Sequence, residues 1–537
     1  MAMMDVDLNS WLLFEHAPRH FGSTEVVTRF EGGRVHRYTY ADFARRAQQL
    51  MHALDHLGVA AGERVATLAW NSYRHLECYF AIPCSGRILH TLNLRLGPDD
   101  LGWIIADADD RVILCDPDLL PLLERLPAGR LAGVRHVVVL ADDVPPSSLP
   151  GTVSFEDLIS AEPATYEPKA IDEHTPLGLC YTSGTTGRPR GVLYTHRSTV
   201  LHAMAASSRA GLGVGPQECI LPVVPMFHVN AWGMPHAGVG AGAKQVFLAG
   251  PLDPAALLDV CAAEEVTIAA GVPTVWLAVA EEMARRGVQM PPSLHHIICG
   301  GAQPSRALIE RYQREFGVPI VQAWGMTETS PLGSVAWPKH HMRHWDEQQL
   351  TEQVRTKAGL PGLGVSVSIR DAEGAEVPWD GHTMGELWVR GPWVVESYWK
   401  GAGAEQFTPN GWFRTGDIAV GTPEGYFVIA DRTKDLIKSG GEWISSMELE
   451  AAIMAMPEVT EAAVVAMPDP RWQERPLAFV VPKEGATVSL ESVRTHLESG
   501  GWQRWQLPDR VEIIGAVPKT SVGKFDKKAL RARLPAS

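Results

Sequence analysis

The sequence lacks the features that mark secreted and membrane-spanning proteins. Its first residues, MAMMDVD, are acidic and carry no apolar core of a signal peptide. No run approaches the eighteen apolar residues of a membrane span. The seven cysteines form no C-x-x-C pair and lie among apolar residues, which predicts buried, reduced thiols. These absences favour a cytoplasmic protein.

An excess of basic residues is also missing. The formal net charge is -14 and the pI is about 5.8. Proteins that bind nucleic acid usually present a basic face. The balance therefore argues against a nucleic-acid partner, and any nucleotide must be held by local donors.

The pattern of apolar residues predicts several α/β units. A chain of 537 residues with 45% hydrophobic residues indicates two to four domains. Helical spacing over residues 40–57, together with short apolar runs, is typical of βαβ units and mostly parallel sheets. The apolar runs lie at 62–69, 111–115, 134–140 and 177–181.

The pattern changes after about residue 359. Runs of period two at 365–370, 385–390 and 426–429 predict an antiparallel or barrel-like segment. A charged stretch at 431–435 follows, and beyond it about a hundred residues have their own α/β rhythm. We therefore expect a domain boundary at the charged stretch.

A glycine- and hydroxyl-rich loop, YTSGTTGRPRG at residues 181–191, follows a predicted buried strand. Glycines allow tight turns whose amide N–H groups face one point, and the hydroxyls add donors. The loop lacks the G-K-[ST] ending of a Walker A motif. It is suited to holding phosphate oxygens.

This loop resembles the phosphate loop of the adenylate-forming superfamily, which includes acyl-CoA synthetases, luciferases of the firefly type and adenylation domains of peptide synthetases. Where the family usually has Lys, this chain has Arg190, which keeps the charge but is a planar fork. The resemblance implies an ATP contact by Thr182, Ser183, Gly184, Thr185, Thr186, Gly187 and Arg190.

Two further motifs extend the resemblance. AWGMTET at 323–329 is similar to the family's aromatic-Gly-x-Thr-Glu motif, and WFRTGD at 412–417 to the motif whose aspartate takes both ribose hydroxyls. The implied catalytic residues are Thr327 and Glu328, and Glu328 with Thr182 would hold Mg²⁺. The implied nucleotide contacts also include Gly301, Gln322, Ala323, Trp324, Gly325 and Asp417.

The last part of the chain resembles the family's hinge, its glycine-rich turn and its C-terminal lysine. DRTKDLIKSGGEWI at 431–444 supplies Arg432 and Lys434 as nucleotide and hinge residues. The implied CoA contacts are Lys438, Ser439, Gly440, Gly441 and Trp443. PKTSVGK ends at Lys524, which would bridge the α-phosphate and the substrate carboxylate.

The acyl end is predicted from MFHVNAW at 226–232 and CGGA at 299–302. Relatives that activate amino acids carry Asp where this chain has His228, which argues against an amino-acid substrate. The apolar surroundings favour an apolar acyl group. The expected acyl contacts are His228, Val229, Trp232, Gly300 and Ala302.

The resemblance covers nearly the whole chain, and is nearest to bacterial medium- and long-chain fatty acyl-CoA synthetases and methylmercaptopropionate-CoA ligases. It implies an α/β body of two α/β subdomains and a small β-barrel over residues 1–430, a hinge at 431–435, and a mobile, smaller α+β lid over 436–537. ATP and CoA would be co-substrates, Mg²⁺ the cofactor, and a homodimer is suggested by analogy.

The expected reaction joins a carboxylic acid, medium- to long-chain by resemblance, to CoA through an acyl-adenylate. Three alternatives stay open: a methylmercaptopropionate, short-acid or aryl-acid CoA ligase, an enzyme that passes the acyl group to a carrier protein or to oxygen, and a non-catalytic nucleotide sensor. An acyl substrate also leaves peripheral contact with a membrane surface open.

Overall fold

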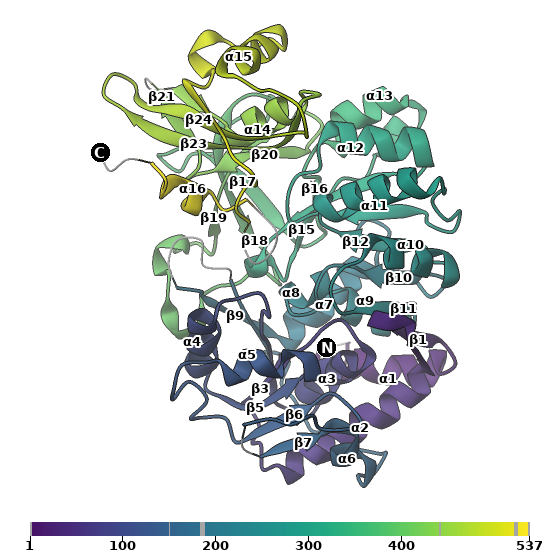
Figure 1. Ribbon diagram of the computed structural model, residues 1–537. Coiled ribbons are helices and arrows are strands. Elements are labelled where there is room, and N and C mark those ends of the chain that lie inside the picture. The colour runs from purple at the N-terminus through teal and green to yellow at the C-terminus, as the bar shows by residue number, and fades with distance from the viewer. Residues whose placement is uncertain (1–2, 150, 183–187, 440–441, 520–524, 535–537) are drawn as a thin grey trace.

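The computed structural model describes residues 3–149, 151–182, 188–439, 442–519 and 525–534. In those ranges no helix has the length and apolar character that crossing a bilayer requires. The described residues form four sheets, and helices cover the three that have the most strands (Figure 1). The predicted α/β class, with a large N-terminal body and a smaller C-terminal unit, is confirmed.

Two large sheets form the body. The nine-stranded sheet runs in the order β16 (Leu360–Pro361), β15 (Leu332–Val335), β14 (Ile320–Gly325), β13 (His296–Cys299), β12 (Ile268–Gly271), β10 (Cys219–Pro222), β11 (Lys244–Ala249), β1 (Glu25–Phe30) and β2 (Val35–Thr39). The seven-stranded sheet runs β7 (Thr152–Ser154), β6 (His136–Val139), β5 (Asp110–Cys115), β3 (Arg64–Leu68), β4 (Ile88–Thr91), β8 (Pro176–Tyr181) and β9 (Gly191–Thr195). Most pairs are parallel, as βαβ units require.

Helices pack in three layers around these sheets. One continuous core joins both sheets to the layer between them, which comprises α1 (Ser10–Phe21), α2 (Tyr40–His56), α3 (Tyr73–Cys84), α7 (His196–Ser207) and α9 (Met234–Ala241). The outer faces are covered by α4 (Pro98–Ala108) and α5 (Leu120–Glu124) on one sheet, and by α10 (Pro254–Ala263), α11 (Pro273–Arg286) and α12 (Arg306–Arg311) on the other. Shorter helices are α6 (Phe155–Ser160), α8 (Val229–Trp232) and α13 (Glu347–Leu350).

Helix α2 illustrates why the sequence folds in this way locally. Thr39 and Asp42 form a reciprocal capping box that satisfies two N-terminal amides. The apolar residues then recur at helical spacing, and that face is buried in the central layer. The prediction of a helix over 40–57 is confirmed to within one residue.

A smaller sheet links the body to the C-terminal unit. Strands β17 (Ser366–Arg370), β18 (Met384–Arg390), β19 (Phe413–Gly421) and β20 (Phe427–Arg432) pair antiparallel in sequence order, as the period-two pattern predicts. Short 3₁₀ and π turns lie along the chain at η1 (Glu31–Gly33), η2 (Pro117–Leu119), η3 (Tyr312–Phe316), η4 (Thr327–Thr329), η5 (His340–His344), η6 (Thr351–Arg355), η7 (Trp399–Gly401), η8 (Ala404–Gln406) and η9 (Arg504–Gln506).

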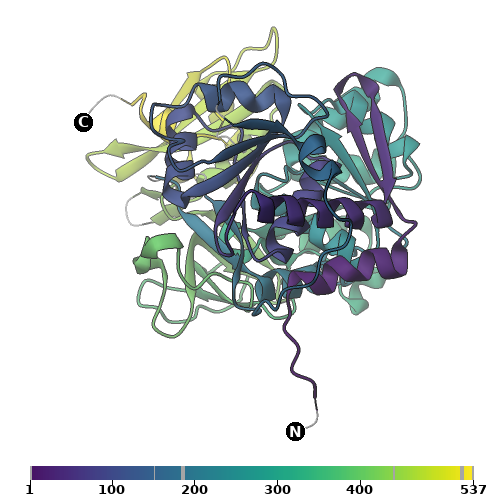
Figure 2. The same cartoon turned by 90° about the horizontal axis from the view of Figure 1, so that it is seen from below.

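The C-terminal unit is a separate sheet with helices on both faces, drawn yellow-green in Figure 1. Its strands are β22 (Glu442–Ile444), β21 (Ile437–Ser439), β24 (Gln473–Pro482), β23 (Val459–Asp469) and β25 (Arg510–Ile513). Helices α14 (Ser446–Met454) and α15 (Leu490–Ser499) pack on one face and α16 (Lys527–Arg531) on the other. The domain limits at 430 and 435 stay a prediction. At the other end of the chain, Figure 2 shows the segment before α1 leaving the body, and Met3 and Met4 on it are exposed.

Candidate functional site

The predicted nucleotide residues converge where β14, β19 and β20 meet. Trp324 lies near the end of β14, and its indole Nε1 donates to Oδ2 of Asp417 on β19 at 3.0 Å. Asp417 is paired in register with Arg432 at the end of β20, whose Nε lies 2.6 Å from Asp417 Oδ1. The aspartate is buried and its negative charge raises the pKa of Arg432. Three motifs that are distant in sequence thus share one cluster, to which Gln322, Ala323 and Gly325 contribute as neighbours on β14.

The next turn of the chain, η4, carries the predicted catalytic pair. Thr327 and Glu328 are both 7% exposed. Tyr194 donates its phenol to the Thr327 carbonyl at 2.8 Å, and Tyr398 donates to Glu328 Oε1 at 2.6 Å. Burial raises the pKa of Glu328, and the Tyr398 hydrogen bond and Arg432 act in the opposite direction. The carboxylate is therefore held in a fixed place inside the protein.

The glycine-rich loop is closed at its neck. The Thr182 amide donates to the Arg190 carbonyl at 2.9 Å, and the Arg190 amide donates to Thr182 Oγ1 at 3.1 Å. The intervening Ser183, Gly184, Thr185, Thr186 and Gly187 lie outside the described residues. The Arg190 guanidinium donates to Gln406 and stacks over Tyr398, with Cζ 5.2 Å from the ring centre. The neck pairs the predicted metal contact Thr182 with the predicted phosphate contact Arg190.

Two of the residues predicted to contact the acyl group lie beside residues predicted to contact the nucleotide. A Cβ on Gly300 would come 3.2 Å from the Trp232 ring and 2.7 Å from the carbonyl oxygen of Ala323, so only glycine fits between them. Trp232 also faces Gly301. Gly300 is buried, Gly301 and Ala302 are exposed, and His228 is half-buried. The structure thus brings Trp232 and Gly300, two of the predicted acyl residues, next to Ala323 on β14.

The segment before Trp232 has an unusual backbone. Five consecutive residues have positive φ: Val229 (48°), Asn230 (51°), Ala231 (47°), Trp232 (57°) and Gly233 (73°). A left-handed turn costs about 1–2 kcal/mol per non-glycine residue, so it must be held by its surroundings. Cys180 Sγ lies 3.4 Å from Asn230 Oδ1, and Gly233 abuts the His202 ring. The sequence predicts a functional segment here but not this conformation.

The predicted CoA residues belong to the C-terminal sheet. Lys438 on β21 is paired in register with Trp443 on β22, and its Nζ lies 5.4 Å from the centre of the indole, which is 45% exposed. Ser439 Oγ accepts from Arg475 at 2.9 Å. Burial lowers the pKa of Lys434, whose carbonyl accepts from Arg531 at 3.2 Å. Gly440, Gly441 and Lys524 lie outside the described residues.

The chemistry of the donors fits Mg²⁺ carried by a nucleotide. Glu328 offers a carboxylate and Thr182 a hydroxyl, which are hard oxygen ligands. Mg²⁺ usually takes one or two carboxylates and fills its other positions with phosphate oxygens and water. Among the described residues no group of three or more His, Cys, Asp or Glu side chains could hold an ion by itself. A cation here would therefore depend on the phosphates of its nucleotide.

Some residues that support the site were not found from the sequence, among them Tyr398 and Asn71. Tyr398 holds Glu328, and Asn71 holds the acyl segment by donating to the Pro222 and Val224 carbonyls at 3.0 and 2.9 Å and accepting from the Met226 amide at 2.7 Å. Asn71 follows β3 in a Trp-Asn-Ser run, and such a polar residue after a buried strand is the signal that could have identified it.

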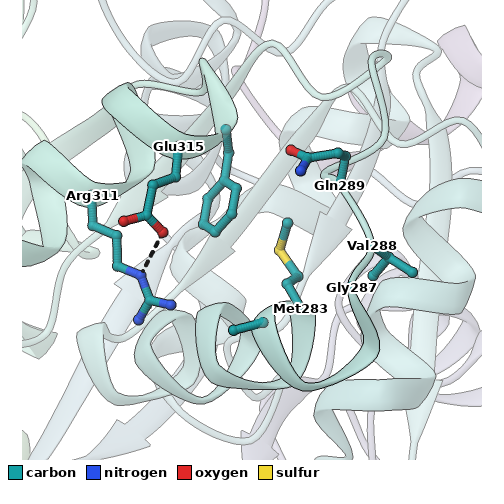
Figure 3. Close-up of a pocket in the computed structure, with 8 residues that line it drawn as sticks. Met283, Gly287, Val288, Gln289, Arg311 and Glu315 are labelled. Carbon is teal, nitrogen blue, oxygen red and sulfur yellow. Dashed lines mark hydrogen bonds and ion pairs between the residues drawn. The ribbon is translucent and has the colours of Figure 1, made fainter.

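A separate surface pocket of about 380 Å³ lies between the end of α11 and η3 (Figure 3). Met283, Gly287 and Val288 form one side, and Arg311, paired with Glu315 at 3.0 Å, lies opposite. None of the residues that line it belongs to the predicted site. The nucleotide and acyl residues are therefore assembled elsewhere, at the ends of β14 and β19.

Comparison with known families and proteins gives a consistent result. The AMP-binding enzyme family matches residues 13–399, and the AMP-binding enzyme C-terminal domain matches residues 448–524. A long-chain-fatty-acid–CoA ligase of Thermus thermophilus is 47% identical over 98% of this chain and 96% of its own length. A 3-methylmercaptopropionyl-CoA ligase of Ruegeria lacuscaerulensis is 41% identical over 97% and 96%, and a medium-chain-fatty-acid–CoA ligase of Ectopseudomonas oleovorans is 39% identical over 97% and 95%.

Solved structures share the whole fold. The crystal structure of an anthranilate CoA ligase in complex with anthranoyl-AMP superposes with a TM-score of 0.87 at 25% identity, covering 98% of each chain. The crystal structure of ATP-bound MatB from Rhodopseudomonas palustris superposes with a TM-score of 0.82 at 24% identity, again over 98% of each chain. The similarity therefore extends through both the body and the C-terminal unit.

Proposed function

The chain belongs to the AMP-binding enzyme family, and from this premise we propose that it is an AMP-forming acyl-CoA ligase for a medium- to long-chain fatty acid. The observation that carries the proposal is the convergence of Trp324, Glu328, Asp417 and Arg432 at the ends of β14, β19 and β20. An indole, a buried carboxylate and a carboxylate–guanidinium pair are the groups that adenine, a phosphate-bound cation and ribose hydroxyls require.

The reaction consists of two displacements. First, a carboxylate oxygen of the acid attacks the α-phosphorus of ATP, and the bond to the β-phosphate oxygen breaks to release pyrophosphate. The acid is already ionised at neutral pH, so no general base is needed. Second, the sulfur of CoA attacks the acyl carbon of the adenylate, AMP leaves, and the thiol proton goes to solvent.

The residues act on charge and position. Lys524 offsets the repulsion between the acid and the α-phosphate, and Thr327 contacts that phosphate. Glu328 and Thr182 would hold Mg²⁺, and the ion would neutralise charge on the phosphates. Asp417 accepts hydrogen bonds from the ribose hydroxyls, while Arg432 and Trp324 hold its carboxylate in place. The loop over 182–190 receives the β- and γ-phosphates.

The substrate class rests on the acyl set and on the relatives. Trp232 lies against Gly300 and Gly301 within reach of Ala323, and its neighbours Phe227 and Val229 are apolar and buried. Position 228 is His rather than an acidic residue that would pair with an amine. Fatty acids are the named substrates of the relatives from Thermus and Ectopseudomonas, and methylmercaptopropionate remains the alternative because of the relative from Ruegeria.

Further parts of the proposal concern the whole molecule. Residues 1–430 form the AMP- and acyl-binding body, 431–435 the hinge and 436–537 the lid, which turns about Lys434 between the two steps. The lid would present Lys524 first and then Gly440 and Gly441 with Lys438, Ser439 and Trp443 to CoA. We further propose a cytoplasmic enzyme that forms a homodimer.

The test is formation of AMP from ATP and Mg²⁺, with and without CoA, over acetate, methylmercaptopropionate, butyrate to palmitate, benzoate and cinnamate. A CoA-dependent signal that peaks at a medium or long aliphatic acid is expected. A peak at methylmercaptopropionate would replace the substrate class and keep the reaction. Pyrophosphate exchange without CoA-dependent turnover would move the acyl group to another acceptor.

A further inference from the structure

One buried tyrosine contacts two residues that the proposed reaction needs. The phenol of Tyr398 donates to Glu328 Oε1 at 2.6 Å, and its ring lies under the Arg190 guanidinium with Cζ 5.2 Å from the ring centre. Tyr398 is 4% exposed and Glu328 is 7% exposed. A bond between a phenol and a carboxylate in such surroundings is strong and directional.

Tyr398 is itself held firmly. Its ring packs edge-on against Phe407 and Phe413, with centroids 5.5 and 6.3 Å away. The turn that carries Glu328 is tied to the segment before Tyr398, since the Val395 amide donates to the Glu328 carbonyl and Ser330 Oγ donates to the Trp393 carbonyl, both at 2.8 Å. Residues 393–398 therefore act as a support behind the turn that carries Glu328.

Arg190 is held over the ring of Tyr398 by contacts of its own. Its guanidinium donates to Gln406 and lies 3.4 Å from Glu405 Oε1. A Cβ at Gly403 would stand 2.4 Å from Arg190 Nη1, so the chain leaves room for the fork by having glycine there. The planar guanidinium suits a stacked site in a way that a lysine ammonium does not. Two of its donors are thus directed to η8, while its Cζ lies over the Tyr398 ring.

We propose that Tyr398 is a positioning residue that fixes the Glu328 carboxylate for the Mg²⁺ carried by ATP, and that Arg190 keeps the tyrosine ring in place. This inference rests on the proposed function. It assigns Arg190 an action through Tyr398 in addition to its charge near the phosphates. It also gives a reason for arginine where the family usually has lysine.

The decisive measurement is the affinity of the whole protein for ATP, by calorimetry, with Mg²⁺ and with EDTA in its place. For Tyr398→Phe we expect about a 10-fold weaker affinity for MgATP, the range for loss of a hydrogen bond to a charged group, and metal-free ATP within about 2-fold of the unchanged protein. Arg190→Lys should weaken MgATP by about 3-fold, as loss of a stacked cation predicts. The matched control is Tyr312→Phe, because that buried phenol donates at 2.6 Å to the Trp276 carbonyl away from the site.

A general loss of packing would weaken ATP equally with and without Mg²⁺, and that outcome overturns the proposal. Unchanged binding of MgATP by Tyr398→Phe also overturns it. If Tyr398→Phe does not fold, Arg190→Lys provides the test. The proposal is then wrong if Mg²⁺ changes the ATP affinity of Arg190→Lys by the same factor as it changes that of the unchanged protein. The binding measurement needs no carboxylic acid, so it tests the role of Tyr398 even if the protein activates none of the acids. Failure to activate any acid would contradict the proposed function and not this inference.

Discussion

The indole Nε1 of Trp324 and the Oδ2 of Asp417 lie 3.0 Å apart and share a hydrogen bond, although 93 positions separate them in the sequence. The indole fixes the carboxylate from one side, and Arg432 Nε fixes it from the other at 2.6 Å. Because both partners approach in directions set by strands, the carboxylate is preorganised before a nucleotide arrives.

Removing the Asp417 charge should weaken ATP binding more than removing the Trp324 donor. Asp417→Asn loses the ion pair and one acceptor, so we expect the KM for ATP to rise about 10- to 100-fold. Trp324→Phe keeps an aromatic face and loses one neutral donor, so a rise of about 3- to 10-fold is expected. Steady-state kinetics at saturating acid measure both. Equal effects of the two variants would contradict the assigned roles.

Lys524→Ala should separate the two half-reactions. Adenylation needs a cation between two anions, so pyrophosphate exchange should fall by at least about 100-fold. Thioester formation from a supplied acyl-adenylate should stay within a few-fold, since that step does not use Lys524. Lys519→Ala is the control in the same segment, because its Nζ pairs with Glu461 at 2.6 Å on the surface of the C-terminal unit. If both half-reactions fell equally, the role of Lys524 would be wrong.

Trp232→Ala should shift the choice of acid. The indole faces Gly300 and Gly301, so its removal opens space next to these two residues of the predicted site. We expect kcat/KM for the longest acids to rise at least about 10-fold relative to the shortest, since each methylene that a pocket newly accepts contributes about 1–3 kcal/mol. The ratio for Trp232→Phe should lie between those of the unchanged protein and Trp232→Ala. An unchanged profile over the panel would remove Trp232 from the acyl site.

His75 should make the fold sensitive to mild acid. It is fully buried, with Nε2 2.9 Å from Thr67 Oγ1 and Nδ1 3.0 Å from the Trp70 carbonyl, and burial lowers its pKa to about 4. At pH values between about 4 and the unfolded pKa of about 6.5, His75 binds more protons in the unfolded chain than in the folded protein. The contribution of neutral His75 to the free energy of unfolding is therefore fully present above pH about 6.5 and is lost as the pH falls toward 4.

His75→Gln should therefore flatten the pH dependence. The free energy of unfolding of the unchanged protein should fall by up to about 1.4 kcal/mol per pH unit more than that of the variant below pH about 6.5. Urea denaturation from pH 4.5 to 7.5 measures the difference, and groups that titrate in the opposite direction cancel because both proteins have them. Parallel curves would show that His75 does not titrate in this range.

The C-terminal unit contains a buried ion pair. Lys527 Nζ lies 2.7 Å from Glu450 Oε1 and donates to Ser446 Oγ at 2.6 Å, and both charged side chains are at most 10% exposed. Lys527→Met leaves the carboxylate unpaired and should cost about 3–5 kcal/mol of stability. Burial raises the pKa of Glu450 to about 7, so the loss should be smaller at pH 6 than at pH 8. Guanidinium unfolding measures it, and Lys527→Met with Glu450→Gln should recover part of the loss. A double variant no more stable than the single one would contradict the pairing.

The sequence by itself determined the elements whose signal is local. The helix over 40–57 has its capping box and apolar period written in adjacent residues, and the strands at 365–370 and 385–390 alternate with period two. Short runs of sequence also predicted the chemistry of the site: the glycine- and hydroxyl-rich loop and the motifs that contain Trp324, Asp417 and Lys524. They indicated the family that the comparisons show.

Only the tertiary structure decided which distant side chains meet. The bonds from Trp324 to Asp417 and from Tyr398 to Glu328, and the three hydrogen bonds of Asn71, join positions 70 or more residues apart. Nothing local predicts them, because strand order and helix packing set those distances. The left-handed turn at 229–233 was hidden for the same reason. Local propensity opposes it at Val229, Ala231 and Trp232, and contacts with distant residues hold it, namely Asn230 with Cys180, Trp232 with Gly300 and Gly233 with His202.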